Sequence, residues 1–463
     1  MRRTKKKVKR LRRKSEGQTN VNKRLEGYKR GFNEGYKQGL QAGNNCFDSF
    51  FEGTSIIVPS CNEVESVKRC IESIVNYTDL SYEIIVVDNN SSDGIENYLK
   101  QLNGMVRYHI LPQNQGLAGA LNRGLMMAKG TTILLLSSNV VCTDNWLHNM
   151  LICLQSNSSI GMVGAVSNGM NGGQRYDFDY SCMESMHEFA TINNVSDPAR
   201  WSFSEYLSPK CMLFSRHLLE KVGFLDEGCL TGPFVEEDYC IRVKLQGLSL
   251  VCAGDAFVHF TSGDERLPSS EEETANQQGL LYFTRKWNNP YEFLYSSAKD
   301  QDHSTLRTGV LTAMGWDGPR LGETAFYPQA IAVKGLTETV YWIEDGMRRA
   351  IKGNWRGPVI SLPQIDLWQW TIGSALDEDE AQFRLNIVQG DDQQSILHGS
   401  VCVIADGGMY YMEKGMKRAI VSRFAAEAWF LNERLRITLS DSELLAVPVG
   451  LPIISPVNLR QVL

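Results

Sequence analysis

Residues 54–94 of this chain have the sequence TSIIVPSCNEVESVKRCIESIVNYTDLSYEIIVVDNNSSDG, which indicates the fold class. Ser55–Pro59 and Glu83–Asp88 are short β-branched runs of the kind found in buried strands. Val64–Val75 lies between them and has the apolar spacing of a helix. Strand, helix and strand in this order predict a right-handed βαβ unit and a parallel sheet.

The same alternation continues downstream. Thr131–Ser138 predicts a third buried strand, and the stretch around Leu117–Ala128 predicts the helix that precedes it. We therefore expect one α/β domain over residues 51–287. Because ligands of open α/β sheets bind at the carboxyl ends of the strands, the polar residues that follow each strand are the candidate site.

Three polar motifs occupy these strand ends: PSCNE at residues 59–63, VDNNSSDG at 87–94 and NQGLAGALNRG at 114–124. A carboxylate such as Asp88 can accept the imide N–H of uracil or thymine. Glycine at positions 116 and 119 lets the backbone approach a ligand closely. Each motif alone is typical of an ordinary turn, but their joint order and spacing favour a nucleotide site.

Together these motifs resemble the family-2 glycosyltransferases over roughly residues 52–287. The resemblance includes KCMLFSRHLLEKVGFLDEG (210–228), FVEEDYCIRVKLQG (234–247), VHFTSG (258–263) and RKW (285–287). It implies a GT-A-like, Rossmann-like fold with a mostly parallel sheet flanked by helices. It also implies inverting transfer of a sugar from a UDP- or dTDP-sugar to a glycan, lipid-linked or protein acceptor.

The resemblance assigns roles to individual residues. Asp88 would contact the base, and the diphosphate and sugar would lie near the motif at 114–124. The implied donor-binding residues are Pro59, Asn62, Glu63, Asp88, Asn90, Asn114, Gly116, Arg123, Ser138 and Asn139.

The acidic cluster Glu236-Glu237-Asp238, followed by Arg242, resembles the segment that carries the catalytic base of the family. Inverting transfer needs a carboxylate to take the acceptor proton. Counted back from Arg242, the base position falls on Glu236, whereas the letters ED fall on Glu237 and Asp238. We assign the base to Glu236 or Glu237; the alternative is a solvated helix start, where acidic residues suit the helix dipole.

A departure from the family pattern concerns the metal. The aspartate-containing triplet expected after the third strand is replaced by Ser137-Ser138-Asn139, and neutral oxygens hold Mn²⁺ or Mg²⁺ less well than carboxylates. One hypothesis is that Asn139 and His259 assist a cation held mainly by the diphosphate. The others are charge neutralisation without metal, or a non-catalytic nucleotide-sugar or glycan-binding scaffold. A nucleotidyltransferase is disfavoured, because PSCNE lacks a basic glycine-rich phosphate loop.

Residues 326–463 contain a duplication. Thr339–Ile351 returns as Gly408–Ile420, with Gly346 and Gly415 offset by 69. Each copy has an aromatic run, a glycine turn and a basic-apolar run, which predicts a β-hairpin. We therefore expect a small β-rich domain of two repeats that binds glycan or a protein partner, joined to the α/β domain by a linker over 288–325.

The N-terminal segment differs from the rest. Residues 1–14 hold ten of the 47 Lys and Arg, so the other 449 residues carry 37 basic and 53 acidic groups. The basic tail (1–22) predicts disorder, with contact to an anionic membrane surface as one role. The acidic body argues against nucleic acid as a partner. Residues 23–50 repeat glycine every four positions, which predicts a helical connector that either is poorly ordered or pairs into a homo-oligomer.

The expected location is the cytoplasm, with the inner face of the membrane as the alternative position. The eleven cysteines include no CxxC pair and are odd in number, which is typical of a reduced compartment. The sequence also has no apolar run of the roughly 18 residues that span a bilayer.

Overall fold

The computed structural model describes residues 49–102, 104–169, 172–176, 180, 182–229, 234–261, 270–295, 322–389, 399–404 and 407–460. The predicted basic tail, nearly all of the glycine-periodic connector and most of the predicted linker lie outside these residues. The roles expected for those segments therefore stay predictions. Contacts divide the chain into residues 1–51 and 52–463, and the fold below is that of the second unit.

An eight-stranded mixed sheet forms the first part of this unit, with the order β3-β2-β1-β4-β8-β6-β9-β7. The pairs β1–β2, β2–β3 and β6–β9 are parallel, and β7 and β8 are antiparallel to their neighbours. The predicted α/β fold class is confirmed. The strands are β1 (Phe51–Ser60), β2 (Tyr82–Asp88), β3 (Arg107–Ile110), β4 (Gly130–Leu136), β6 (Ile160–Val166), β7 (Trp201–Phe203), β8 (Cys211–Ser215) and β9 (Ser249–Phe257).

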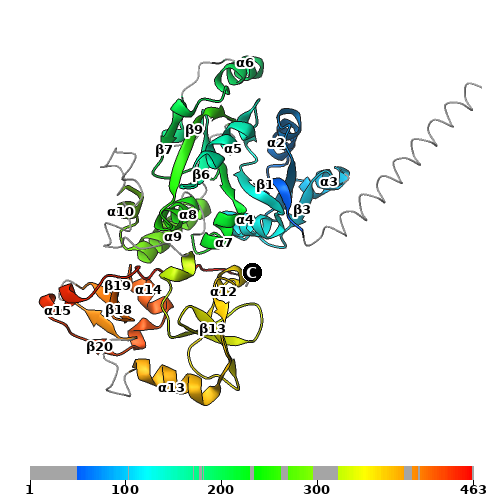
Figure 1. The fold of residues 1–463 in the computed structure, drawn as a ribbon. Helices are drawn as coiled ribbons and strands as arrows, with labels where there is room; N and C mark the ends of the chain where they lie inside the picture. Colours follow the sequence, from blue (N-terminus) through cyan, green and yellow to red (C-terminus); the bar gives the residue numbers. More distant parts are fainter. Residues whose placement is uncertain are drawn as a thin grey trace, which may run out of the picture. The chain divides into compact units, whose positions relative to one another are not determined.

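Helices cover both faces of the sheet because alternate strand residues point to opposite sides. Ile56 and Val58 of β1 pack in one apolar cluster with α2, α3 and α5, whereas Ile57 packs in another with α4, α7 and α8. In Figure 1 this region is blue, cyan and green. The helices are α2 (Val64–Tyr77), α3 (Ile95–Gln101), α4 (Gly116–Met127), α5 (Trp146–Ser156), α6 (Met183–Asn193), α7 (Arg216–Val222), α8 (Phe234–Leu245), α9 (Ser270–Trp287) and α10 (Pro290–Tyr295).

The second part of the unit, yellow to red in Figure 1, is built on two smaller sheets. One has six strands and the other has four. Their elements are η3 (Glu323–Phe326), β11 (Ile331–Lys334), β12 (Val340–Glu344), β13 (Met347–Lys352), β14 (Ile360–Ser361), α12 (Gln364–Leu367), β15 (Thr371–Ile372), β16 (Leu376–Asp377), α13 (Glu378–Gln389), β17 (Val401–Val403), β18 (Met409–Glu413), β19 (Met416–Ala419), α14 (Arg423–Ala428), η4 (Leu431–Glu433), β20 (Arg436–Ile437) and α15 (Asp441–Ala446).

Both predicted hairpins are present. β12 pairs with β13 and β18 pairs with β19, each antiparallel and closed by two residues. The turn residues Asp345-Gly346 and Lys414-Gly415 all have positive φ, between 50° and 74°. This backbone matches the twist of the strands and explains the glycine in each copy. Lys414 Nζ lies 2.8 Å from Asp345 Oδ1, so an ion pair joins the two turns.

The two parts share one apolar core. Phe326, Tyr327 and Trp429 from the repeats belong to the same buried cluster as Phe283 and Trp287 of α9. The sequence predicted separate domains either side of residues 288–325, and those boundaries stay a prediction. The shared cluster means that the repeats are packed against the α/β part rather than merely attached to its end.

A buried ion-pair network crosses this junction. Lys286 Nζ lies 2.6 Å from a carboxylate oxygen of Asp226 and 2.6 Å from one of Asp238. Arg242 Nε lies 3.0 Å from Asp238, and its Nη1 lies 3.0 Å from Glu323. All five side chains are at most 1% exposed. The network therefore ties α8 and α9 to the first residues of the C-terminal part.

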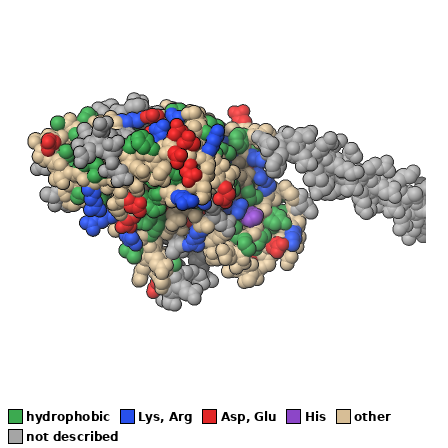
Figure 2. All heavy atoms as spheres, turned by 90° about the horizontal axis from the view of Figure 1, so that it is seen from below, with side chains coloured by type: hydrophobic (Ala, Val, Ile, Leu, Met, Phe, Trp, Pro, Cys, Tyr) green, Lys and Arg blue, Asp and Glu red, His purple; other side chains and the backbone are tan. Residues whose placement is uncertain are grey.

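No helix among the described residues is long and apolar enough to cross a membrane. Figure 2 shows basic, acidic and apolar side chains interspersed on the face seen from below. Charge alone therefore does not mark a site on that face.

Replacing Lys286 by Met should destabilise the protein strongly, because two buried carboxylates lose their shared cation. Breaking a buried ion pair costs about 3–5 kcal/mol, and urea denaturation measures the free energy of unfolding. Lys100→Met is the matched control, since Lys100 is 57% exposed and pairs with Glu96 at the surface, where an ion pair contributes little to stability. Equal effects of the two substitutions would contradict the assigned role of Lys286.

Candidate active site

The parallel register places the ends of β1 and β2 side by side, with Ser60 opposite Asp88. Asp88 is 1% exposed. One of its oxygens accepts the Ser91 backbone N–H at 3.0 Å, and the other accepts the Ser91 hydroxyl. A carboxylate has about four lone-pair positions, so both oxygens keep capacity for a ligand. Asp88 is thus an oriented acceptor at the edge where ligands of such sheets bind.

Asparagine residues shape the loops after these strands. Asn62 and Asn90 have φ of 56° and 63°, a left-handed conformation that asparagine tolerates well. Asn62 Oδ1 accepts the Ser92 N–H at 2.8 Å, and Asp93 accepts the Val64 N–H at 2.7 Å. These bonds tie the two predicted motifs together. Pro59 lies one residue before the end of β1, opposite Val87.

Asn89 fastens the third motif to the second. Its side-chain amide donates to Asn114 Oδ1 at 2.9 Å and to the Gly116 carbonyl at 3.2 Å. Its oxygen accepts the Gln115 N–H at 2.8 Å. Gly116 has a φ of 78°, which explains the glycine there. The predicted residues Asn114 and Gly116 are therefore brought to the site by a residue that sequence reasoning overlooked.

Arg123, the last predicted donor-binding residue of the third motif, lies beside a histidine. It lies on α4 near His109 of β3, where its charge adds to partial burial in lowering the pKa of that imidazole. Its predicted proximity to the diphosphate stays a prediction.

At the end of β4, Glu63 supplies the carboxylate that the sequence there lacks. It accepts the Ser138 hydroxyl with one oxygen and the Asn139 side-chain amide, at 3.2 Å, with the other. The Asn139 carbonyl accepts the Thr261 N–H at 2.9 Å. Glu63 therefore stands beside both residues predicted to face the diphosphate, although it comes from the loop after β1.

His259 lies on the neighbouring ribbon, in which β10 (His259–Phe260) pairs with β5 (Val140–Val141). Its Nδ1 lies 2.6 Å from the Tyr180 hydroxyl. Burial lowers the pKa of His259, and nearby His187 lowers it further. The ring is therefore neutral near pH 7, the form that can bind a metal.

The residues around Glu63 fit a divalent cation that is bound jointly by the protein and by substrate phosphates. No group of three or more His, Cys, Asp or Glu side chains converges within the part of the chain that the structure describes. Mg²⁺, however, is commonly held by one or two carboxylates together with substrate phosphates. Glu63 and the side-chain oxygen of Asn139 could hold a cation that the donor diphosphate also binds.

The three acids at the start of α8 have different surroundings. Burial raises the pKa of Glu236 to about 8 and that of Glu237 to about 7. One oxygen of each is buried with no hydrogen-bond partner among the described residues. Nearby Lys210 partly offsets the effect of burial on Glu236, and burial lowers the pKa of Lys210 itself.

Lys210 connects Glu236 to the rest of the site. Its ammonium donates to the Gly169 carbonyl at 2.9 Å and lies 4.0 Å from the centre of the Phe260 ring. Phe260 follows His259 directly, so Glu236 and Lys210 lie towards the same edge as Asn139.

Asp238 has both oxygens engaged within the protein. One accepts from Arg242, and the other faces Lys286 and accepts the Trp287 indole N–H at 2.8 Å. The two nearby cations lower its pKa in spite of burial. These contacts support a structural role for Asp238 and leave Glu236 and Glu237 as candidates for the base.

Residues 55–223 match the family described as glycosyl transferase family 2. The chain carries a family-2 glycosyltransferase domain.

Curated relatives of this glycosyltransferase domain include two named enzymes. Glycosyltransferase AglE of Haloferax volcanii is 27% identical over 152 residues, which cover 31% of this chain and 49% of AglE. The poly(ribitol-phosphate) β-N-acetylglucosaminyltransferase TarP of Staphylococcus aureus is 33% identical over 115 residues, which cover 24% of this chain and 35% of TarP. The chain thus spans half or less of the length of these two relatives.

Among solved structures, the mannosyltransferase PcManGT of Pyrobaculum calidifontis, in complex with GDP-Man and Mn²⁺, is similar with 17% identity. Its TM-score is 0.38, and the match covers 57% of this chain and 74% of that one.

The raised pKa of Glu236 predicts how stability depends on pH. The folded protein keeps a proton on this group that the unfolded chain, with a pKa of 4.5, releases. The stability that comes from protonated Glu236 is therefore complete below pH 4.5 and is lost as pH rises through about 8. Glu236→Gln should remove this loss.

Urea denaturation of both proteins between pH 5 and 9 measures the effect. Glu220→Gln is the control, since that glutamate is largely exposed. Parallel stability curves for the wild type and Glu236→Gln would contradict the burial of an ionisable Glu236.

Proposed function

We propose that this chain transfers a sugar with inversion from a UDP- or dTDP-sugar to a glycan, lipid-linked or protein acceptor, with Glu236 as general base. The observation that carries the proposal is the buried carboxyl of Glu236, which has one oxygen without a partner among the described residues. Such a group suits proton transfer, because a base is most effective with a pKa near the working pH.

The proposed step is a single displacement. The acceptor hydroxyl oxygen forms a bond to the anomeric carbon while the bond from that carbon to the diphosphate breaks. The bonding electrons leave with the nucleoside diphosphate, and the acceptor proton passes to the Glu236 carboxylate. Attack opposite the leaving group inverts the configuration.

The other site residues bind and orient the donor in this proposal. Asp88 accepts the base imide N–H, and the left-handed turns at Asn62 and Asn90 hold the two loops around it. The backbone at Gly116 leaves room for the diphosphate. A divalent cation held by Glu63 and Asn139 would neutralise diphosphate charge when bound.

Glu237 is the second candidate for the base. Its pKa is also raised by burial, to about 7, whereas at Glu236 the charge of Lys210 offsets part of the effect of burial. The lysine would steady the Glu236 carboxylate beside the acceptor, which favours Glu236.

Asp88→Ala should weaken UDP or dTDP binding without unfolding the protein. Loss of a hydrogen bond to a charged group costs about 1.5–3 kcal/mol, which is roughly a tenfold to hundredfold rise in Kd. Calorimetry measures Kd, and exposed Asp79→Ala is the control. Unchanged affinity in Asp88→Ala would contradict the assignment of Asp88 to the base.

Glu236→Gln should lower turnover by about 10²–10⁴-fold and leave donor affinity nearly intact, since a general base acts on the acceptor. The wild-type rate should rise with pH through about 8, where Glu236 ionises. Glu237→Gln is the paired variant and should retain turnover. If only Glu237→Gln lost turnover, Glu237 would be the general base. If both variants kept full turnover, neither Glu236 nor Glu237 would be the base.

Asn139→Asp should create a stronger metal site. The new carboxylate would face Glu63, whose oxygen lies 3.2 Å from the present amide nitrogen, and a cation between them relieves the repulsion. We expect tighter Mn²⁺ binding in the presence of UDP, by about 1–2 kcal/mol, and a larger rise in Tm on adding Mn²⁺.

Asp144→Asn tests whether Asp144 is the metal ligand. In the structure, one oxygen of Asp144 accepts the Thr191 hydroxyl at 3.0 Å. A strong metal response that Asn139→Asp leaves unchanged and Asp144→Asn abolishes would show that Asp144 holds the cation. Absence of nucleotide and metal binding in every variant would favour the scaffold hypothesis.

A further inference from the structure

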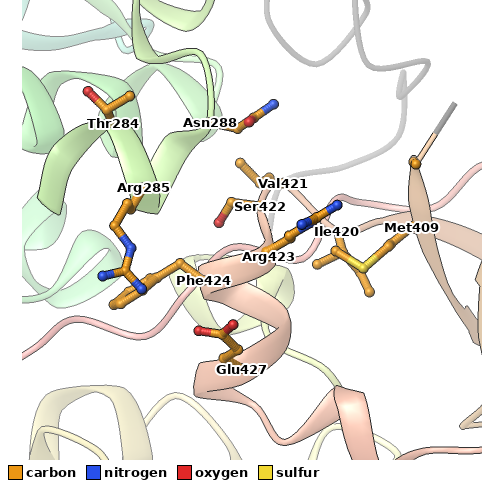
Figure 3. Close-up of a pocket in the computed structure, with 12 residues that line it drawn as sticks. Thr284, Arg285, Asn288, Met409, Ile420, Val421, Ser422, Arg423, Phe424 and Glu427 are labelled. Atoms are coloured by element: carbon orange, nitrogen blue, oxygen red, sulfur yellow. The ribbon is translucent and has the colours of Figure 1, made fainter. Parts of the chain in front are cut away.

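A groove of about 790 Å³ lies between α9 and the second repeat. Thr284, Arg285 and Asn288 line one side, and residues of β18 and α14 line the other. Figure 3 shows Arg285, Arg423 and Glu427 around this space. A volume of this size lies within the range of about 300–1,000 Å³ that is typical of ligand sites.

The charged side chains of the groove are mostly basic. Arg285 and Arg423 have no ion pair to an acidic group in the described parts of the chain, and Glu427 is the single acidic residue that lines the space there. The Arg285 guanidinium lies 5.8 Å from the centre of the Phe424 ring. Guanidinium groups bind carboxylate and phosphate oxygens in pairs, so the groove suits an anion.

The corresponding positions of the first repeat carry different side chains. At the repeat offset of 69, Phe424 corresponds to Trp355 (424 − 69) and Arg423 to Asn354 (423 − 69). Trp355 packs against Trp342, with ring centres 6.2 Å apart, and the space beside them is only about 10 Å³. The second repeat therefore has an arginine at the groove where the first repeat has an asparagine.

The walls of the groove are fixed to each other. The Ser422 hydroxyl donates to the Lys286 carbonyl at 2.7 Å and accepts the Ala425 N–H at 3.1 Å, which caps α14. Tyr282 of α9 packs edge-on against Phe424, with ring centres 5.3 Å apart. Lys286 belongs to the buried network that also holds α8, so the groove is held rigidly to the helix that carries Glu236.

We propose that this groove binds an anionic segment of the acceptor glycan, one that carries carboxylate or phosphate groups. Arg285 and Arg423 bind the anionic oxygens, while Asn288 and Glu427 bind sugar hydroxyls. The inference rests on the proposed transferase function and applies to a glycan acceptor that is longer than the sugar at the reaction centre. Segments away from that centre then fix its position.

Direct binding to the full chain tests this proposal without any need for turnover. The probes are a polyuronate oligomer, an alditol-phosphate oligomer and a neutral oligosaccharide of similar length, measured by calorimetry at low and high salt. We expect at least one anionic oligomer to bind, the neutral one to bind at least tenfold more weakly, and salt to weaken anionic binding. The oligomer that binds identifies carboxylate or phosphate as the recognised group.

The double variant Arg285→Gln/Arg423→Gln should lose at least tenfold in affinity for that oligomer and keep the affinity for UDP or dTDP. Arg356→Gln is the control, an exposed arginine of the first repeat that should change neither. Asp88→Ala should do the reverse of the double variant, which separates failure of the groove from failure of the donor site. Equal binding of neutral and anionic oligomers, binding unaffected by the double variant, or no oligomer binding would each overturn the proposal.

Discussion

The pairing of Asp238 with Lys286 and Arg242 is the interaction on which the arrangement of this protein depends. Taking these charges out of water costs several kcal/mol per ion, and only close pairing with further hydrogen bonds offsets that cost. Asp226 and Glu323 complete the set. Burial raises the pKa of Glu323 to about 8, and the charge of Arg242 limits that rise. The start of the C-terminal part is thereby fixed to α8 and α9.

The same network explains why adjacent acids on α8 differ. Asp238 faces cations, which lower its pKa, whereas burial raises the pKa of Glu236 and nearby Lys210 only partly offsets that effect. One residue holds the helix in place, and its neighbour two positions earlier keeps an oxygen without a partner among the described residues. A rigid helix that carries a protonatable carboxyl is what proton transfer to a positioned base requires.

Much of the fold could be predicted from local pattern. The β-branched runs around Ile57 and Val86 and the helical spacing of Val67, Ile71 and Ile74 give strands and a helix where expected. The hairpins were also predictable, because a two-residue hairpin turn requires positive φ, which glycine adopts readily. Those signals are local in sequence, and the structure agrees with them.

The relations between distant residues could not be predicted in this way. Glu63 bonds to Ser138 and Asn139 about 75 residues away, and nothing in the PSCNE motif indicates those partners. The shared core was missed because amphipathic patterns show which residues are buried but not what covers them. Asp238 was grouped with its neighbours because the three adjacent acids differ only in contacts that the fold creates.

The central claim is that this chain transfers a sugar with inversion and that a carboxyl on α8 takes the acceptor proton. Proton NMR of the full chain incubated with a panel of nucleotide sugars and glycan acceptors tests it most directly, with Glu236→Gln in parallel. The account predicts that one UDP- or dTDP-sugar is consumed, that the nucleoside diphosphate is released and that the new linkage has the opposite anomeric configuration. It also predicts that the variant is at least a hundredfold slower. Retention of configuration, or nucleotide binding without turnover of any donor, would contradict the account.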